Sequence, residues 1–266
     1  MRWITHAMAI TIGLLMLPTA SRAQSPGNRP STAQSRRVGE ERDRATNAVF
    51  TSAVDADGNA RLTVSVGDFL LEKALASSGD TTLRLSQGKD VVTIAMTQTG
   101  YVVARGKRTA RFDPRAGQSD GRDSIRSVLL GSQAVRTFRR LSAALENRES
   151  TEDEGPLLMS SLIDGAIVET LDGDTGAAER IGKRVTSRRR ARLQAIAFKP
   201  ETLRDCVGMY EVALLDAWDL YAQCVYAART SPWWVMAWAE DFCEWEWLIR
   251  SQQYIWQFIG CVSVPF

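Results

Sequence analysis

Four cysteines are the residues of this 266-residue chain whose spacing indicates the most definite chemistry. They follow one another at intervals of 18, 19 and 18 residues, as Cys206, Cys224, Cys243 and Cys261. Cysteines of an exported chain form disulfides, and four of them allow three pairings. Four free, buried thiols are one alternative. A zinc site of four thiolates is another, although no C-x-x-C spacing supports it.

The helices expected to carry these cysteines restrict the pairing. A capping pattern (T-x-x-D) begins at Thr202 and marks a helix start. Ser231 and Pro232 then supply a turn, an N-cap and a favourable first helical residue. The sequence therefore predicts two helices, at about 202–229 and 232–259, joined by a tight connection.

Only one pairing fits such a hairpin. Cysteines 18 residues apart on a straight helix are separated by about 27 Å, which excludes a bridge within either helix. Bridging Cys206 to Cys243 would need parallel helices, and the connection is too short for that. The sequence therefore predicts Cys206–Cys261 and Cys224–Cys243. The residue numbers of both pairs add to the same total, as facing positions of an antiparallel hairpin do.

Histidine chemistry is nearly absent from this chain. Its one histidine, His6, lies in a segment that resembles an export signal. Removal of that segment would exclude a Ser-His-Asp triad, a Cys-His pair and any His-ligated metal. We assign no catalytic residue, and we expect neither a metal nor another cofactor.

Residues 1–23 have the three parts of a secretory signal: a basic start, the uncharged apolar run 7–17, and small residues before a cleavage point after Ala23. We therefore expect an exported protein, periplasmic or extracellular, and the arginine bias suggests a bacterial source. An uncleaved anchor is the alternative, although the apolar run is short for a membrane span. No transmembrane span is expected in the mature chain.

Charge does not favour nucleic acid as a partner. The formal net charge of +2 comes from two arginines of the signal, Arg2 and Arg22, so the mature chain would be neutral. Residues 201–266 hold 3 basic and 9 acidic groups. The segment Arg180 to Arg192 holds 7 basic groups and no acid. We interpret that segment as a solvated helix face attracted to the acidic hairpin. A membrane-binding surface and a cleavage site are the alternatives.

Hydropathy patterns divide the mature chain into four regions. Residues 24–47 are polar and predict a disordered linker, and residues 48–115 alternate like the strands of a small antiparallel β-meander. We expect a short helix at Asp68–Ser77 within the meander. In residues 116–199 the apolar residues recur at helical spacing, which predicts a helical region. Strands are predicted at Ala48–Val54, Arg61–Val66, Thr81–Leu85, Val91–Thr97 and Tyr101–Arg105.

The predicted fold class is therefore α+β: a small β-meander, a helical region, and a disulfide-stapled antiparallel helical hairpin at 200–266. Seven of the eight tryptophans lie in that hairpin. We expect most of them in the core. They cannot all face one direction, however, so some aromatic surface must meet a partner or another part of the chain. The candidate interaction residues are Trp233, Trp234, Trp238 and Trp245.

Three functions are compatible with this pattern. The first is a non-enzymatic structural or interaction protein of the cell envelope, whose partner would be a protein or another envelope component. The second is a glycan-acting enzyme that uses paired carboxylates. Its candidate residues are Glu240, Asp241, Glu244 and Glu246. The third is a precursor that releases its C-terminal hairpin as a peptide after cleavage near Arg190.

Overall fold

The computed structural model describes residues 36–55, 57–116, 120–147, 155–174, 176–192, 203–231 and 233–263. The predicted signal and the first part of the predicted linker lie outside these residues.

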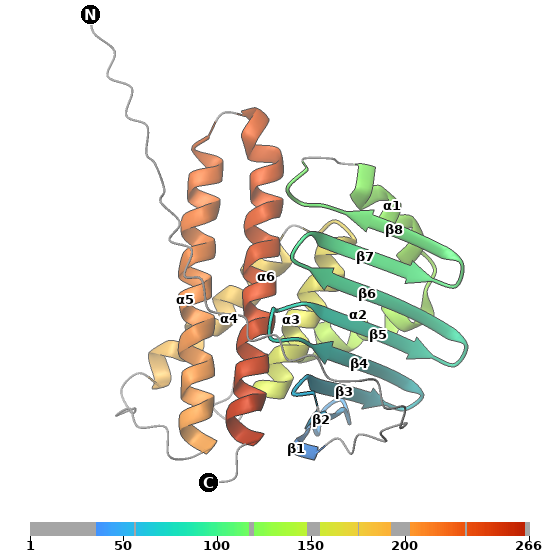
Figure 1. The fold of residues 1–266 in the computed structure, drawn as a ribbon, viewed down its shortest axis with the longest axis vertical. Helices are drawn as coiled ribbons and strands as arrows, with labels where there is room; N and C mark the ends of the chain where they lie inside the picture. Colours follow the sequence, from blue (N-terminus) through green and yellow to red (C-terminus); the bar gives the residue numbers. More distant parts are fainter. Residues whose placement is uncertain are drawn as a thin grey trace, which may run out of the picture. The chain divides into compact units, whose positions relative to one another are not determined.

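A single antiparallel sheet occupies the first half of the described chain, and each strand pairs with its neighbours in sequence (Figure 1). The strands are β1 (Arg36–Arg42), β2 (Val49–Val54), β3 (Ala60–Val66), β4 (Phe69–Leu75), β5 (Thr81–Gln87), β6 (Asp90–Thr97), β7 (Gly100–Arg105) and β8 (Arg108–Phe112). This meander needs only short turns, because antiparallel neighbours can be joined by tight hairpins.

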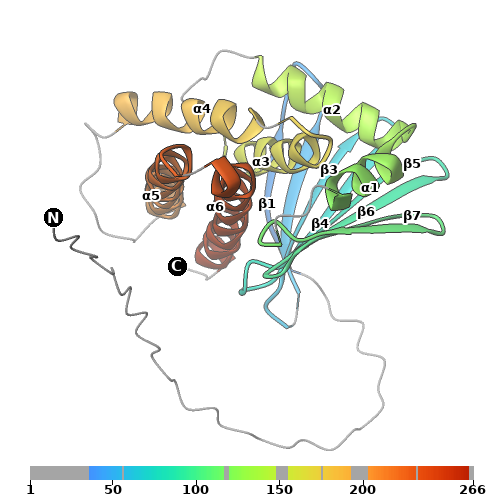
Figure 2. The same ribbon diagram turned by 90° about the horizontal axis from the view of Figure 1, so that it is seen from above.

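Helices follow the sheet and cover one of its faces. They are α1 (Asp120–Leu129), α2 (Gln133–Glu146), α3 (Pro156–Leu171), α4 (Ala177–Arg192), α5 (Leu203–Arg229) and α6 (Trp233–Ser263). Helix α1 contacts β7 and β8, α2 contacts β4 to β6, and α6 contacts β1 to β4. Figure 2 shows α3 beside the sheet and surrounded by other helices, and α5 and α6 as a pair. The predicted α+β class is confirmed.

Alternation along the strands explains which face of the sheet is buried. Val92, Ile94 and Met96 of β6 are all buried, as are Leu83 and Leu85 of β5. Successive strand side chains point to opposite faces, so these residues point toward the helices. Two rings from different layers meet there, since Phe69 of β4 stacks on Phe138 of α2 at 5.9 Å.

The linker prediction is wrong at its C-terminal end, because β1 lies within it. Arg36–Arg42 is charged and has no clear apolar alternation, so composition indicated a polar linker. Pairing with β2 supplies the backbone hydrogen bonds of β1. In addition, the carboxylate of Glu41 accepts hydrogen bonds from the backbone N–H groups of Leu157 and Leu158, at 3.2 and 3.1 Å, and so caps α3.

The short helix predicted at Asp68–Ser77 is also wrong, because β4 occupies Phe69–Leu75. Its Leu, Glu, Lys and Ala residues favour a helix by intrinsic propensity, but pairing with β3 on one side and β5 on the other overrides that preference. The inward side chains of β4 include a lysine, Lys73, which hides the alternation. The structure also contains β8, a strand that the sequence did not predict.

Helix α3 is buried on all sides, with almost every residue in the core. Pro156 begins this helix, as predicted. An ion pair connects the helix to the sheet: Lys73 Nζ lies 2.7 Å from Asp164 Oδ1 and also donates to Ser160 Oγ at 2.7 Å. From the other side, Gln252 of α6 donates to Asp164 at 3.5 Å.

The α5–α6 hairpin has nearly the predicted bounds. Its helices run from 203 to 229 and from 233 to 263, against the predicted 202–229 and 232–259. The two helices lie side by side along their lengths (Figure 1). Its attachment to the rest of the protein runs mainly through α6, which contacts α3 and four strands.

We predict that Lys73→Met destabilises the protein by about 3–5 kcal/mol, because it leaves Asp164 buried without its cation. Urea unfolding measures this change. The double variant Lys73→Met/Asp164→Leu removes both charges and should recover most of the lost stability. A single variant within about 1 kcal/mol of wild type, or a double variant no better than the single, would contradict this assignment.

Candidate functional site

Two disulfides fix the α5–α6 hairpin. Cys206 is bonded to Cys261 and Cys224 to Cys243, which is the pairing predicted from the spacing. The Cα atoms of the two pairs are 5.9 and 5.7 Å apart. One bridge joins the helices near the start of α5, and the other lies closer to the connection. The hairpin therefore cannot separate without breaking a covalent bond.

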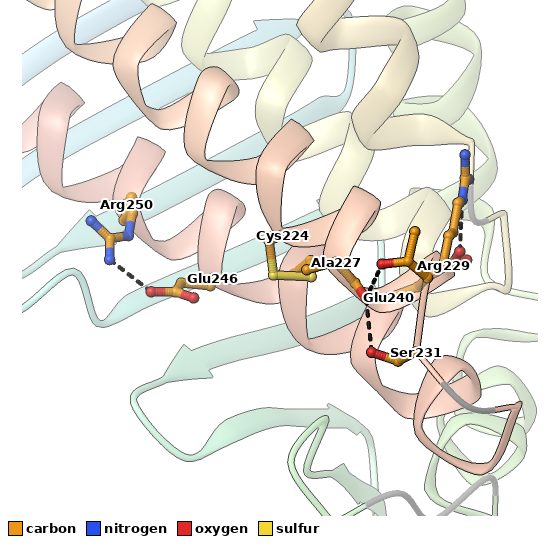
Figure 3. Close-up of a disulfide and its surroundings, with 9 residues drawn as sticks. Cys224, Ala227, Arg229, Ser231, Glu240, Glu246 and Arg250 are labelled. Atoms are coloured by element: carbon orange, nitrogen blue, oxygen red, sulfur yellow. Dashed lines mark hydrogen bonds and ion pairs between the residues drawn. A yellow bond between two sulfur atoms is a disulfide. The ribbon is translucent and has the colours of Figure 1, made fainter. Parts of the chain in front are cut away.

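Polar contacts accompany the Cys224–Cys243 bridge (Figure 3). Arg229 of α5 forms an ion pair with Glu240 of α6 at 2.8 Å, and Arg250 pairs with Glu246 one turn earlier in α6 at 2.7 Å. A small pocket of about 120 Å³ opens beside the disulfide. It is lined by Ala217, Leu220, Tyr221, Cys224, Cys243, Glu246, Trp247 and Arg250.

The structure corrects the role of Trp245. Its side chain is only 2% exposed, so it belongs to the core and not to an interaction surface. It packs near Phe242, and the Arg115 guanidinium lies 4.8 Å from its ring centre, a cation–π contact. The side chains of the other three candidates, Trp233, Trp234 and Trp238, lie outside the described part of the structure.

Exposed apolar side chains lie instead on α5. Three of the four large hydrophobic residues that are strongly exposed in the described chain belong to this helix: Met209 is 50% exposed, Leu220 46% and Tyr226 73%. Asp216 and Asp219 of α5 are exposed as well. Met209 and Leu220 are eleven residues apart, about three helical turns, and so share one side.

We call the exposed surface that these residues form the outward face of α5: Met209, Asp216, Asp219, Leu220 and Tyr226. Met209, Asp216 and Leu220 follow one strip of the helix, and Asp219 and Tyr226 lie roughly 100° further round its axis. Figure 2 shows α4 and α6 as the neighbours of α5. Leu220 lies at the border of the face with α6, where it lines the pocket beside Cys224 and Cys243. Sequence reasoning missed this face because it followed the tryptophans. The available signal was a second set of apolar residues on α5, in addition to Leu214 and Ala217, which are buried.

The four acidic candidates have different partners. Three form ion pairs: Glu240 with Arg229, Asp241 with Arg122, and Glu246 with Arg250. Glu244 is instead 3% exposed and lies where α6 meets α3 and α4. The Thr170 hydroxyl donates to its carboxylate at 2.6 Å, and the Ala178 backbone forms a further hydrogen bond with it.

Burial is the largest influence on the pKa of Glu244. It raises the pKa of this carboxyl to about 7, and the nearby charge of Asp241 adds to that rise. The Thr170 hydrogen bond and the Arg122 guanidinium act in the opposite direction. Burial also raises the pKa of Asp241, against the effect of Arg122. The protonation of Glu244 therefore changes near neutral pH.

Lys73, Ser160 and Asp164 form a constellation that the sequence did not predict. A lysine bonded to a serine hydroxyl can act as the general base for a nucleophile. Here the side chains of Lys73 and Asp164 are only 0% and 2% exposed, and Ser160 is buried as well. Burial lowers the pKa of Lys73 and raises that of Asp164. These contacts join β4 to α3 inside the core, so we interpret the three residues as structural.

Part of the basic segment Arg180 to Arg192 contributes to packing. Arg180 forms ion pairs with Glu146 of α2 and Asp174, both at 2.9 Å, and Arg184 donates to the Glu146 carbonyl oxygen. Helix α4 continues through Arg192, so the backbone at Arg190 is helical. The side chains beyond Val185 in this segment lie outside the described residues.

Neither protein-family models, nor curated proteins, nor solved structures match this chain. Within the described ranges, no helix combines the length and the apolar character needed to cross a bilayer. Those ranges also contain no group of three or more His, Cys, Asp or Glu side chains arranged to hold a metal ion.

We predict that the two disulfides contribute unequally to stability. They close chain segments of 55 and 19 residues, so the loop-entropy model gives about 4 kcal/mol for Cys206–Cys261 and about 3 kcal/mol for Cys224–Cys243. Urea unfolding of the two paired Cys→Ala variants measures the difference. A larger loss for the shorter loop, or another linkage in non-reducing peptide maps, would contradict the prediction.

We predict a pH dependence of stability centred on Glu244. A carboxyl with a raised pKa binds more protons in the folded state, so its stabilising contribution is complete below the unfolded pKa. That contribution is lost as the pH rises from 4.5 through about 7. Glu244→Gln, which mimics the neutral acid, should match wild type near pH 4.5 and exceed its free energy of unfolding by about 3 kcal/mol at pH 8.

The matched control is Glu246→Gln, two residues along the same helix. The Glu246 side chain is 36% exposed, so its replacement should leave the slope of stability against pH close to that of wild type. Parallel slopes for Glu244→Gln and wild type would exclude Glu244 as the titrating group.

Proposed function

We propose that this protein is an exported, non-enzymatic interaction protein of the cell envelope, which binds a partner protein through the outward face of α5. The observation that carries this proposal is the concentration of exposed apolar side chains on one helix. Exposed apolar groups gathered on one surface are typical of interaction sites.

Rigidity supports the same function. Two disulfides and extensive contact with α6 hold α5 in place, so its backbone is fixed before a partner arrives. Pre-ordered surfaces lose less conformational entropy on binding and therefore bind more tightly for the same contacts. Disulfides are also typical of proteins in oxidising compartments, which supports export together with the signal-like N-terminal sequence.

Charge indicates the chemistry of the partner. The outward face of α5 combines Met209, Leu220 and Tyr226 with two carboxylates, and residues 201–266 carry 9 acidic against 3 basic groups. Complementary potentials steer association and reject wrong partners. The partner surface should therefore present basic side chains around an apolar centre.

We predict that a photo-crosslinking residue placed at Tyr226 or Leu220 forms an adduct with one envelope protein in the producing cells. The same residue at Leu130, which directly follows α1 and is 78% exposed, should form none. Purified partner should then bind Leu220→Asp and Tyr226→Asp about tenfold more weakly than wild type, or weaker still. Leu130→Asp should bind normally.

Two results would contradict the proposed function. One is equal binding of the partner by wild type, Leu220→Asp and Tyr226→Asp. The other is an adduct only with a second copy of the chain, which would make the face a self-association surface. Cell fractionation tests export separately: the protein should be found outside the cytoplasm with both disulfides formed.

A further inference from the structure

A second surface feature lies on α2, where the helix passes the end of β5. A hollow of about 390 Å³ opens there, lined by Gln87, Gln133, Arg136, Thr137 and Arg140. This volume is within the range of small-molecule sites. Its lining differs from that of most such sites, because every side chain is an amide, a hydroxyl or a guanidinium. The hollow is therefore suited to a polar, anionic ligand.

The two arginines of this hollow have no partner in the described part of the chain. Both are exposed, and neither makes a hydrogen bond or ion pair there. Nearby arginines behave differently: Arg139 pairs with Asp172, and Arg105 lies 2.8 Å from Asp90.

The positions of these two arginines do not stabilise α2. Arg136 and Arg140 are four residues apart on one side of α2, where like charges repel. Arg136 also lies in the first turn, close to the positive end of the helix dipole. Local stability therefore does not explain the pair.

The backbone at the start of α2 is already occupied. The carboxylate of Asp90 accepts hydrogen bonds from the N–H groups of Gln133 and Ala134, at 2.6 and 3.1 Å, and from the Ser132 hydroxyl at 2.7 Å. The Arg105 guanidinium offsets the charge of that carboxylate. An anion in the hollow would accordingly be held by side chains and not by the free N–H groups of a helix end.

The wall of the hollow is fixed before a ligand arrives. The Thr137 hydroxyl donates to Gln87 Oε1 at 2.6 Å, and Gln87 Nε2 donates to Asp68 at 3.1 Å. This chain of hydrogen bonds sets the orientation of the Gln87 amide. Two carboxylates take part in these contacts. Asp68 accepts a hydrogen bond from Gln87, and Asp90 accepts one from Arg105.

We propose that this hollow binds the phosphate group of a polar, hydroxyl-bearing ligand. Arg136 and Arg140 hold the phosphate oxygens, since the guanidinium fork matches phosphate geometry and remains charged at all relevant pH values. Gln133 and Thr137 bond the ligand's hydroxyl groups. The phosphate belongs either to a soluble sugar phosphate or to a lipid headgroup. This site is independent of the function proposed for α5.

Calorimetry with the full mature protein tests the site, using inorganic phosphate, glucose 6-phosphate, and vesicles of phosphatidylglycerol or of phosphatidylcholine. We expect binding of glucose 6-phosphate or of the phosphatidylglycerol vesicles, and none of phosphatidylcholine. Arg136→Gln or Arg140→Gln should each weaken that binding about tenfold, and the double variant should abolish it. Binding of the sugar phosphate identifies a soluble ligand, and binding of the vesicles alone identifies a lipid.

The control is the double variant Arg108→Gln/Arg111→Gln, which removes two exposed arginines from β8 and gives the same net charge. It should bind as wild type does. The Arg136/Arg140 double variant should also unfold at the same or a higher urea concentration, because a repulsion is removed. Equal losses in both double variants, or no binding of any phosphate probe by wild type, would overturn the proposal.

Discussion

The ion pair between Lys73 and Asp164 determines how the layers of this protein fit together. Helix α3 is apolar and buried on every side, so hydrophobic burial alone gives it no preferred rotation about its axis. The Lys73 ammonium fixes that rotation, because it meets Asp164 and Ser160 one turn apart on the same side of the helix. Gln252 extends the same network to α6, so sheet, central helix and hairpin share one set of polar contacts.

The two proposed binding surfaces use this rigid arrangement in different ways. The outward face of α5 is held by covalent bonds within the hairpin, and α6 connects it to α3 and the sheet. The hollow on α2 is held by hydrogen bonds from strand ends, through Gln87 and Asp90. One surface is apolar and acidic, and the other is basic. The protein could therefore contact a protein and a phosphate-bearing ligand at the same time.

Sequence reasoning succeeded where one physical rule dominates. Alternation located β5 and β6, and helical spacing of the cysteines located the hairpin and its bridges. Sequence reasoning failed where tertiary contacts determine the secondary structure or the burial of a residue. Lys73 made β4 resemble a helix because a lysine at an inward position hides the strand alternation. The Asp164 carboxylate that pairs with it is 91 residues away in sequence. Trp245 was misplaced because its burial depends on packing near Phe242 and Arg115, which no local pattern reveals. The hollow on α2 was missed for the same reason.

The position of the cysteines also bears on the order of assembly. Cys206 and Cys224 precede Cys243 and Cys261 along the chain, so the two cysteines that come first in sequence are a non-native pair. Once α5 forms, it keeps those two sulfurs on one side of a rod and several turns apart, out of bonding range. A helical α5 therefore excludes the non-native bridge, and both correct partners come from α6.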